Sequence, residues 1–474
     1  MNYSQFFLMR PEVSLMTIFV IIFIFDLIAT GRYRRLFHAL VCLLVFIHTC
    51  VCLKSTDDVT LFGGMYIGNT LTSFVKAMLT FGCMLIILQA NRWLRSASTY
   101  YKQGEFYVLL LSTLAGMYFM ISARHFLLLF IGIELASLPL ACLVAFDKYR
   151  HHSAEAGIKY ILSSMFSSAV MLYGISFLYG VCGTLYFDEM PMLLNAAPMH
   201  IFALALFFAG LGFKISLVPF HLWTADSYQG APTVVTAYLS VISKGAAVFT
   251  LFTVLTSVFS NMVQEWQKML YILTVASITV ANLMAIKQQD LKRFMAFSSI
   301  SQSGYIMLAV IGGTEKGMAA LLYYVLVYIV ANLAIFGVIE TIEPQLRHNA
   351  RREDCNALYS TNPRLSLLMT LALFSLAGIP PFAGFFSKFF VYVSAVDAGF
   401  WILVLIALVN TVISLYYYLL IVKAIFIEKN DNPVPALKCD RFTRVSLVIC
   451  FIGIILLGIC SFVYTEIEIL VSAI

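Results

Sequence analysis

The amino-acid sequence predicts an all-α polytopic membrane protein with about 14 transmembrane helices in two related halves. Composition is the first observation: 61% of the 474 residues are hydrophobic and 11% are charged, whereas soluble proteins carry roughly 25% charged residues. The mean hydropathy is +0.91, and a soluble fold of this length could not hide so much apolar surface from water. This composition excludes most soluble enzymes, and we expect no nucleic-acid partner.

The second observation is the number of apolar runs. A helix needs about 20 apolar residues to cross about 30 Å of hydrocarbon. Fourteen runs are long enough: 13–30, 36–53, 70–90, 106–123, 125–146, 157–180, 199–222, 232–258, 268–286, 294–312, 317–340, 364–397, 400–427 and 444–465. The loops are mostly short, which predicts one helical bundle without an inserted soluble domain. The first run ends at a basic cluster and is typical of an uncleaved signal anchor.

The third observation is the distribution of lysine and arginine, which concentrate on the cytoplasmic side of membrane proteins. Of the 30 basic residues, 21 fall in alternate loops beginning with the first, and five fall in the opposite set. This asymmetry supports an even number of spans. It predicts a multi-pass protein of the bacterial inner membrane with both termini on the outer face.

Four lysines remain, and all lie inside predicted spans: Lys76, Lys214, Lys244 and Lys388. Unlike arginine, a lysine among apolar neighbours can lose its proton near neutral pH. The sequence offers one deep carboxylate, Glu134, which cannot neutralise four ammonium groups. An uncompensated charge in the bilayer costs several kcal/mol. The pattern therefore predicts an interior that binds and releases protons with the help of internal water.

Simpler roles remain open for some of these residues. Lys76 lies about six residues into its span, so it could equally reach the headgroup region. Glu134 could be a fixed counter-ion for one lysine. His221 follows a proline kink on the same helix as Lys214 and could pass protons to the cytoplasmic side, or it could serve packing or helix capping.

Two spans are predicted to break. Pro219 follows Lys214 by five residues and interrupts the seventh span. The twelfth span, at 34 residues, would be about 50 Å long as a continuous helix, so the glycine- and proline-rich segment Gly378–Gly384 must interrupt it just before Lys388. Broken helices in membranes occur where protein or water satisfies the freed backbone groups.

Motifs for bound cofactors are missing from the sequence. The ten cysteines contain no C-x-x-C pair, and neither a dinucleotide fingerprint, a P-loop nor H-E-x-x-H occurs. His38 and His48 are scattered along the second span without the spacing of a haem site. We expect no metal or cofactor in this chain.

Several motifs together resemble one family. They are Gly132-Ile-Glu134-Leu-Ala-Ser-Leu-Pro139, Lys214 through Pro219-Phe-His221-Leu-Trp223, Ser243-Lys244-Gly245, and Ser375-Leu-Ala-Gly378-Ile-Pro380-Pro-Phe-Ala-Gly384-Phe-Phe-Ser-Lys388. They look like the antiporter-like membrane subunits of respiratory complex I, over roughly the fourth to thirteenth spans. The lysine at 388 and the end of the chain after the fourteenth span resemble the family's N-type branch rather than its M-type branch, which has glutamate there.

The resemblance implies two five-helix inverted repeats, at 105–258 and 259–430, between three N-terminal helices (1–104) and a C-terminal helix (431–474). It implies that Glu134 pairs with Lys214, that Lys244 relays protons across the centre, and that Lys388 lies in the outward half-channel. Two positions depart from the family: Ala225 replaces proline, and Gln302 replaces histidine, which puts a titratable relay in the tenth helix in doubt.

The resulting hypothesis is a non-redox, proton-translocating subunit of an NADH:quinone oxidoreductase. NADH, flavin, iron–sulfur clusters and quinone are expected in partner subunits. The implied partners are the M-type antiporter-like subunit and the small K- and J-type subunits, together with lipid, protons and internal water. The alternatives are a subunit of a multi-subunit Na⁺/H⁺ antiporter and a structural spacer without a transport role.

Overall fold

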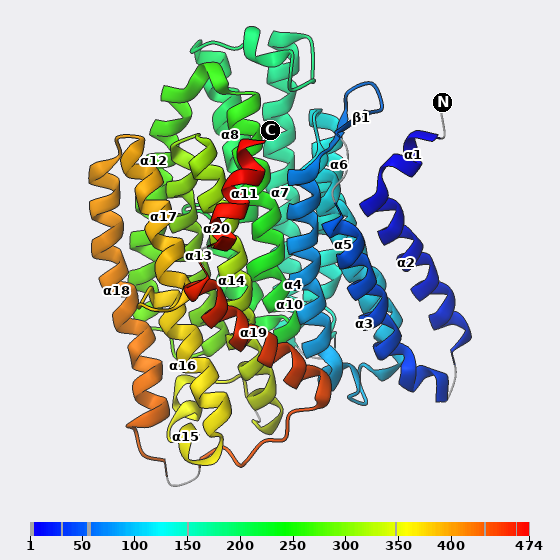
Figure 1. Cartoon of the computed structure of the whole chain (residues 1–474), viewed down its shortest axis with the longest axis vertical. Coiled ribbons are helices and arrows are strands. Elements are labelled where there is room, and N and C mark those ends of the chain that lie inside the picture. Colours follow the sequence, from blue (N-terminus) through cyan, green and yellow to red (C-terminus); the bar gives the residue numbers. More distant parts are fainter. Residues whose placement is uncertain are drawn as a thin grey trace. The chain divides into compact units, whose positions relative to one another are not determined.

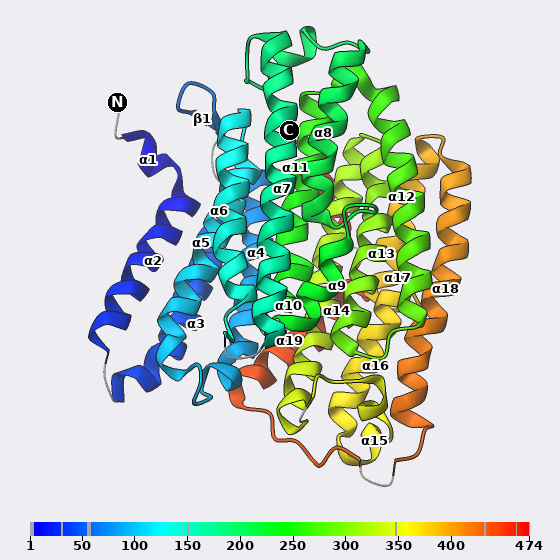
Figure 2. The ribbon, with the colours of Figure 1, turned by 180° about the vertical axis from the view of Figure 1, so that it is seen from behind.

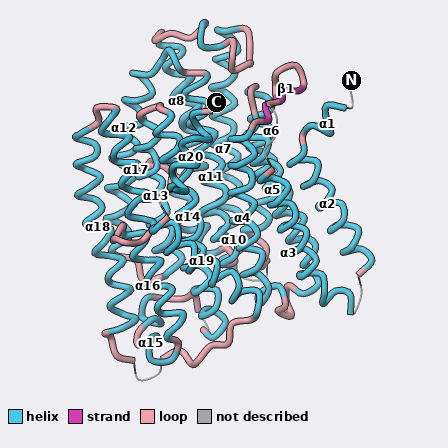
Figure 3. The backbone as a smooth tube through the Cα atoms, viewed as in Figure 1, coloured by secondary structure: helices cyan, strands magenta, loops and turns pink. Residues whose placement is uncertain are grey.

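The computed structural model of the protein describes residues 4–29, 32–54, 58–148, 151–346, 348–430, 433–460 and 462–473. Within these residues 13 helices are long and apolar enough to cross a membrane. The helices α16 (Pro363–Ala377) and α17 (Ala383–Asp397) make up the remaining predicted span. The prediction of an all-α polytopic membrane protein is confirmed, and Figure 3 shows how little of the backbone lies outside helices.

The chain forms two compact units. The first unit holds Met1–Lys214 and Gly245–Trp266, and the second holds Ile215–Lys244 and Gln267–Ala473. In Figure 1 the first unit begins with the blue helices, and the second ends with the red ones.

The first unit consists of membrane helices and one β-hairpin. Its elements are α1 (Ser4–Leu8), α2 (Arg10–Ile28), α3 (Arg32–Leu53), β1 (Val59–Leu61), β2 (Tyr66–Gly68), α4 (Thr70–Leu94), α5 (Gln103–Ser122), α6 (Phe126–Val144), α7 (His151–Cys182), α8 (Pro198–Ile215) and most of α11 (Lys244–Ser257). Asn69 begins α4 with a capping box, because its side chain accepts from the Thr72 amide at 2.8 Å.

The helices α5 and α6 pack closely because glycines face each other. A Cβ atom at Gly116 would come within 2.3 Å of the Ala136 amide nitrogen, and one at Gly132 within 2.8 Å of the Met120 nitrogen. Small residues allow membrane helices to approach in this way. Figure 2 shows α5 and α6 side by side. This contact fixes the segment of α6 that carries Glu134.

The second unit contains two helices, α13 (Leu291–Ile311) and α14 (Glu315–Ile342), that are buried over almost their whole length. Its elements are α9 (Leu222–Gly230), α10 (Thr233–Tyr238), most of α12 (Val263–Ile286), α13 (Leu291–Ile311), α14 (Glu315–Ile342), α15 (Leu358–Thr361), α16, α17, α18 (Trp401–Phe426), α19 (Arg441–Ile459) and α20 (Phe462–Ser472). Asp290 begins α13 by accepting from the Arg293 amide at 3.0 Å. Nearly every residue of α13 and α14 is buried.

Both predicted helix breaks are confirmed. α8 ends at Ile215, Ser216 has a φ of +65°, and α9 begins at Leu222. The Val218 amide in this break donates to the Ser277 hydroxyl at 2.9 Å. α16 ends at Ala377, where Gly378 has a φ of +87°, a conformation that glycine adopts without a steric penalty. α17 resumes five residues later (Figure 1).

Two predicted helix ends are wrong. α2 begins at Arg10, three residues before the expected start of the first run, and therefore includes Glu12. The last predicted span, 444–465, consists of two helices, because α19 ends at Ile459 and α20 begins at Phe462. The Tyr323 hydroxyl donates to the Leu457 carbonyl at 2.6 Å.

Candidate functional site

Lys214 lies in the last turn of α8 and is 8% exposed. Its ammonium donates to the Ser137 hydroxyl on α6 and, at 3.0 Å, to the Ser164 hydroxyl on α7. The Tyr160 ring centroid lies 6.0 Å from the nitrogen. Neutral oxygens and an aromatic face therefore surround this cation.

Glu134 lies one turn before Ser137 on α6. Its carboxylate is close enough to act electrostatically on Lys214, but among the described residues no ion pair joins the two side chains. One carboxylate oxygen, Oε1, is buried without a hydrogen-bond partner in the described part of the chain. A buried acceptor without a donor is costly and is commonly satisfied by water.

Lys244 is the first residue of α11 and is 4% exposed. It follows Leu239–Ser243, a wide π-type turn that interrupts the regular helix, and such turns are frequent at functional sites. Its ammonium donates to the Ser299 hydroxyl on α13 at 2.6 Å. The Tyr228 ring lies 5.8 Å away.

Lys388 lies on α17, in the second turn after the break, and is 4% exposed. Its ammonium donates to the Ala377 carbonyl at 3.0 Å, an oxygen at the C-terminal end of α16. The carbonyls of a helix C-terminus carry partial negative charge and attract cations. The Tyr305 ring centroid lies 4.8 Å from the same nitrogen.

These three lysines share one electrostatic property. Each ammonium is buried and hydrogen-bonded only to neutral oxygens, and within the described residues none of the three forms an ion pair. Each also lies next to an irregularity of the helix that carries it. In low dielectric, such a cation lacks the partner that would fix its protonated form.

His221 occupies the N-cap position of α9, within the break of the seventh span. Its Nδ1 atom is buried without a hydrogen-bond partner in the described part of the chain. The ring is close enough to Lys244 for the two to interact electrostatically. The side chain is partly exposed, so it is less enclosed than the lysines.

Gln302 is part of a hydrogen-bonded network between α13, α14 and α18. It donates to the Tyr418 hydroxyl at 3.1 Å and to the Leu376 carbonyl at 3.4 Å, and it accepts from the Tyr324 hydroxyl. Tyr418 in turn is bonded to Ser298 at 2.6 Å. Leu376 and Ala377 are consecutive residues, so Gln302 and Lys388 bind neighbouring carbonyls at the end of α16.

Lys76 is buried and paired with a second buried carboxylate, Glu12, which the hydropathy pattern does not single out. Lys76 is 1% exposed and forms an ion pair of 2.5 Å with Glu12 of α2. The carboxylate was missed because α2 begins before the apolar run from which the span was predicted. Lys76 therefore differs from the three unpaired lysines.

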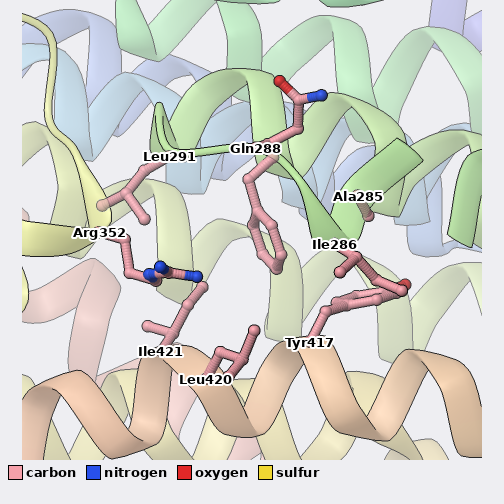
Figure 4. A pocket seen from close by; sticks show the side chains of 9 residues that line it. Ala285, Ile286, Gln288, Leu291, Arg352, Tyr417, Leu420 and Ile421 are labelled. Carbon is pink, nitrogen blue, oxygen red and sulfur yellow. The ribbon is translucent and has the colours of Figure 1, made fainter. Parts of the chain in front are cut away.

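A small pocket lies apart from all these lysines, where α12 ends and α13 begins. It is lined mostly by apolar side chains and contains none of the predicted site residues. Figure 4 shows the guanidinium of Arg352 and the side chain of Ile421 on one side, with Tyr417 and Ile286 on the other. The Tyr417 hydroxyl donates to Asn282 Oδ1 at 3.0 Å, which connects the pocket to polar groups between α12 and α18.

The hydroxyl partners Ser137, Ser164 and Ser299 were not predicted as ligands of particular lysines. Ser137 could have been found, because it lies three residues after Glu134 on the same helix face. Ser299 belongs to the serine-rich run at 297–305, but nothing local in the sequence pairs it with Lys244. Ser164 has no such signal, since serines in membrane helices commonly serve packing.

Comparisons with known proteins show the family to which the chain belongs. Residues 123–414 match a family model described as "NADH:quinone oxidoreductase/Mrp antiporter, TM". The chain is 58% identical over 456 residues to NADH-quinone oxidoreductase subunit N of Phocaeicola vulgatus, covering 96% of both chains. It is 51% identical over 471 residues to subunit N of Azobacteroides pseudotrichonymphae, covering 99% of this chain and 98% of the relative.

Solved structures share the fold. A chain of respiratory complex I from Thermus thermophilus with bound aureothin superposes with a TM-score of 0.81 at 29% identity, covering 94% of this chain and 96% of that one. A chain of the Mrp complex from Dietzia superposes with a TM-score of 0.84 at 19% identity, covering 100% and 97%. At that identity the second likeness concerns the fold alone.

Proposed function

Because the chain belongs to the family of NADH:quinone oxidoreductase and Mrp antiporter transmembrane domains, we propose that it is a membrane-arm subunit of a bacterial NADH:quinone oxidoreductase that carries protons. The protons move through Glu134, Lys214, Lys244 and Lys388, driven by quinone reduction in other subunits. The chain itself performs no redox step. NADH, flavin, iron–sulfur clusters and quinone belong to its partners.

The observation that supports this proposal is the set of three buried lysines without ion pairs in the described residues. A permanently charged lysine in low dielectric needs a counter-ion, whereas a neutral amine does not. Neutral hydroxyl and carbonyl oxygens can accept from either protonation state. The arrangement therefore favours amines that gain and lose a proton. A neighbouring charge can change the free energy of that protonation.

Glu134 is the charge that tunes the first amine. When its carboxylate is ionised it stabilises the Lys214 ammonium, and its removal or protonation favours the neutral amine. A proton leaving Lys214 can then pass through water toward Lys244. Lys388 is the last residue to carry the proton. His221, in the break of the seventh span, is the group through which protons enter or leave.

The test is replacement of Lys244 by methionine in the assembled oxidoreductase. Lys244→Met removes the titratable amine and keeps an unbranched side chain only one atom shorter. We expect proton pumping coupled to NADH oxidation to fall by about tenfold or more, since a positioned proton-transfer group contributes on the order of 10²–10⁴ in rate. Pumping is measured in reconstituted vesicles, with assembly checked on native gels.

The matched control is Lys268→Met, which replaces an exposed lysine near the start of α12. It is expected to leave pumping unchanged. Full pumping by an assembled Lys244→Met complex would contradict the proposal and favour a structural spacer. The antiporter alternative predicts two other results. The chain would purify without redox subunits, and the reconstituted protein would exchange Na⁺ for H⁺ across the vesicle membrane.

We propose that the partners are other membrane-arm subunits, an M-type antiporter-like chain and the small K- and J-type chains. The complex lies in the bacterial inner membrane, with both termini of this chain on the outer face. The unequal distribution of basic residues between alternate loops supports this orientation.

A further inference from the structure

A second group of buried ionisable side chains lies in the first unit, between α2, α4 and the β-hairpin. Glu12 and Lys76, which are 5% and 1% exposed, form an ion pair of 2.5 Å. The Tyr66 hydroxyl, from β2, donates to the second oxygen of Glu12 at 2.9 Å and accepts from Lys76 at 3.1 Å. Each carboxylate oxygen therefore accepts one hydrogen bond.

Two aromatic rings enclose the Lys76 ammonium. The Tyr66 ring centroid lies 5.2 Å from the nitrogen and the Tyr118 ring centroid 5.6 Å away. An aromatic face attracts a cation, and the attraction strengthens when water is excluded. Lys76 thus has support for its positive charge that does not depend on the carboxylate.

A chain of polar groups continues from Tyr118. Its hydroxyl is bonded to His48 Nε2 on α3 at 2.9 Å and to the Thr80 hydroxyl on α4. His48 Nδ1 is bonded to the Ser14 hydroxyl at 2.8 Å. Ser14 lies two residues after Glu12 on α2. The hydrogen-bonded network therefore connects two positions of α2 through residues of α3, α4 and α5.

Within the described residues, the titratable groups that contact or act on Lys76 are Glu12 from α2, Tyr66 from β2, Tyr118 from α5 and Cys52 from α3. His48 from α3 is joined to this set through the Tyr118 hydroxyl. Burial raises the pKa of Tyr66 to about 12, so its hydroxyl stays protonated and can donate to Glu12. Glu12 is the group of this set that lies near the start of its helix, two residues after the exposed Arg10.

All these residues precede position 123, where the match to the antiporter family begins. The function proposed above does not use them. An ion pair buried from water is costly to maintain for packing alone, and apolar side chains of similar size often stabilise a protein equally well.

We propose that Glu12, Lys76 and Tyr66 form a second proton-binding site in the N-terminal helices, with Glu12 as the group that takes up the proton. In the empty form Glu12 is a carboxylate paired with the Lys76 ammonium. On uptake a hydronium ion gives its proton to Glu12, one O–H bond forms, and water is released. The Lys76 charge is then held by the two rings and by the Tyr66 oxygen.

The experiment is infrared difference spectroscopy of the intact oxidoreductase complex, recorded between high and low pH and again before and after addition of NADH. We expect a protonated-carboxyl band that shifts in D₂O and is absent from Glu12→Gln. The matched control is Asp26→Asn on the same helix, because Asp26 pairs with Arg34 at 3.2 Å but is more exposed. This control is expected to retain the Glu12 band.

A purely structural ion pair gives a different result. It predicts the same difference spectrum for the native complex and Glu12→Gln, and that outcome would overturn the proposal. If Glu12→Gln fails to assemble, the double variant Glu12→Gln/Lys76→Met removes both charges together and is recorded instead, with the same band expected to be lost. The part of the carboxyl band that is lost in Glu12→Gln reports Glu12, so failure here is distinct from failure of the Lys244 test.

Discussion

The Lys388 ammonium is bound by a main-chain oxygen, Ala377 O, at the point where α16 ends. A cation at a helix C-terminus gains about 0.3–1 kcal/mol from the helix dipole, which is far less than an ion pair in low dielectric would supply. The charge is stabilised but not fixed. Gly378 is part of the same arrangement, because a Cβ atom there would lie 3.1 Å from Lys388 Cδ.

Replacement of Lys388 by arginine distinguishes the role of its positive charge from the role of its ability to release a proton. Arginine keeps the positive charge but does not release its proton. We expect an assembled Lys388→Arg complex to lose proton pumping by roughly tenfold or more, as a carrier that cannot deprotonate would. Vesicle pumping assays measure this, with Lys316→Arg as the control at an exposed lysine of the same unit. Normal pumping by Lys388→Arg would mean that the lysine serves only as a fixed charge.

The hydrogen-bonded network around Gln302 provides another prediction at this scale. Gln302 cannot titrate, but its hydrogen bonds with Tyr418 and Tyr324 keep the position polar and ordered. Gln302→His is expected to preserve pumping within about twofold, because imidazole can donate and accept at the same place. Gln302→Leu is expected to reduce it by about tenfold, the cost of leaving a buried hydroxyl without its acceptor. Equal pumping by both variants would show that the network does not conduct protons.

Charged residues were the part of the site that the sequence could reveal. Lys214, Lys244 and Lys388 stand out because a charge inside an apolar run is costly. Their serine partners could not be assigned in the same way, since Ser164 and Ser299 meet the lysines only through packing between helices that are distant in sequence. Glu12 was missed because the end of a span is the least certain feature of a hydropathy pattern.

At the scale of elements, the break between α16 and α17 depends on two glycines. A Cβ atom at Gly384 would lie 1.7 Å from the Ser375 carbonyl oxygen, and one at Gly458 on α19 would lie 2.5 Å from the Pro381 carbonyl oxygen. Both obstacles are backbone atoms, which cannot rotate away. The break is therefore held in shape by α19 as well as by its own residues.

Gly458→Ala is expected to destabilise the protein by about 1–3 kcal/mol, the usual cost of forcing an extra carbon into a packed interior. Thermal unfolding of the purified complex in detergent measures the change. Gly180→Ala is the control, because nothing lies within 4 Å of a Cβ atom at that position. In a helix this substitution is expected to be neutral or to stabilise by up to about 1 kcal/mol. Equal melting temperatures for both variants would contradict the close contact at Gly458.

The breaks of the seventh and twelfth spans could be predicted from proline, glycine and run length, because these act locally on the backbone. The bend between α19 and α20 could not. It coincides with the hydrogen bond from Tyr323 to Leu457 and with the stacking of Phe390 on Tyr464 at 3.7 Å. Both are tertiary contacts that no local sequence pattern shows.

At the scale of the whole molecule, the distribution of basic residues predicts how the chain is inserted. Positions 54 and 472 are expected on the outer face, and position 287 on the inner face. Lys54, Ser472 and Lys287 are all exposed, so single cysteines there would be accessible. An impermeant maleimide added to intact cells, after replacement of the exposed native cysteines, is expected to label Lys54→Cys and Ser472→Cys and to leave Lys287→Cys unlabelled. The reverse labelling pattern would show that the chain is inserted in the opposite orientation.

The fold class and the number of spans could be predicted from composition and run length. Every segment that crosses lipid must be apolar over about 20 residues and must satisfy its own backbone hydrogen bonds. The division into two compact units did not follow from that rule. The boundary at Lys214 and Ile215 coincides with the end of α8, and the other boundary falls between Lys244 and Gly245, at the start of α11. Sequence patterns place Lys214 and Lys244 near helix ends, but they do not show that the chain passes from one compact unit to the other at these positions.

The close approach of Gly458 to the interruption at Pro381 has an electrical consequence. The amide and carbonyl groups freed between α16 and α17 would attract water if hydrocarbon alone covered them. A helix backbone without a side chain at the point of contact covers them instead. The backbone of α19 thereby shields the interrupted span, and we expect a gap at that contact to let ions leak across the membrane.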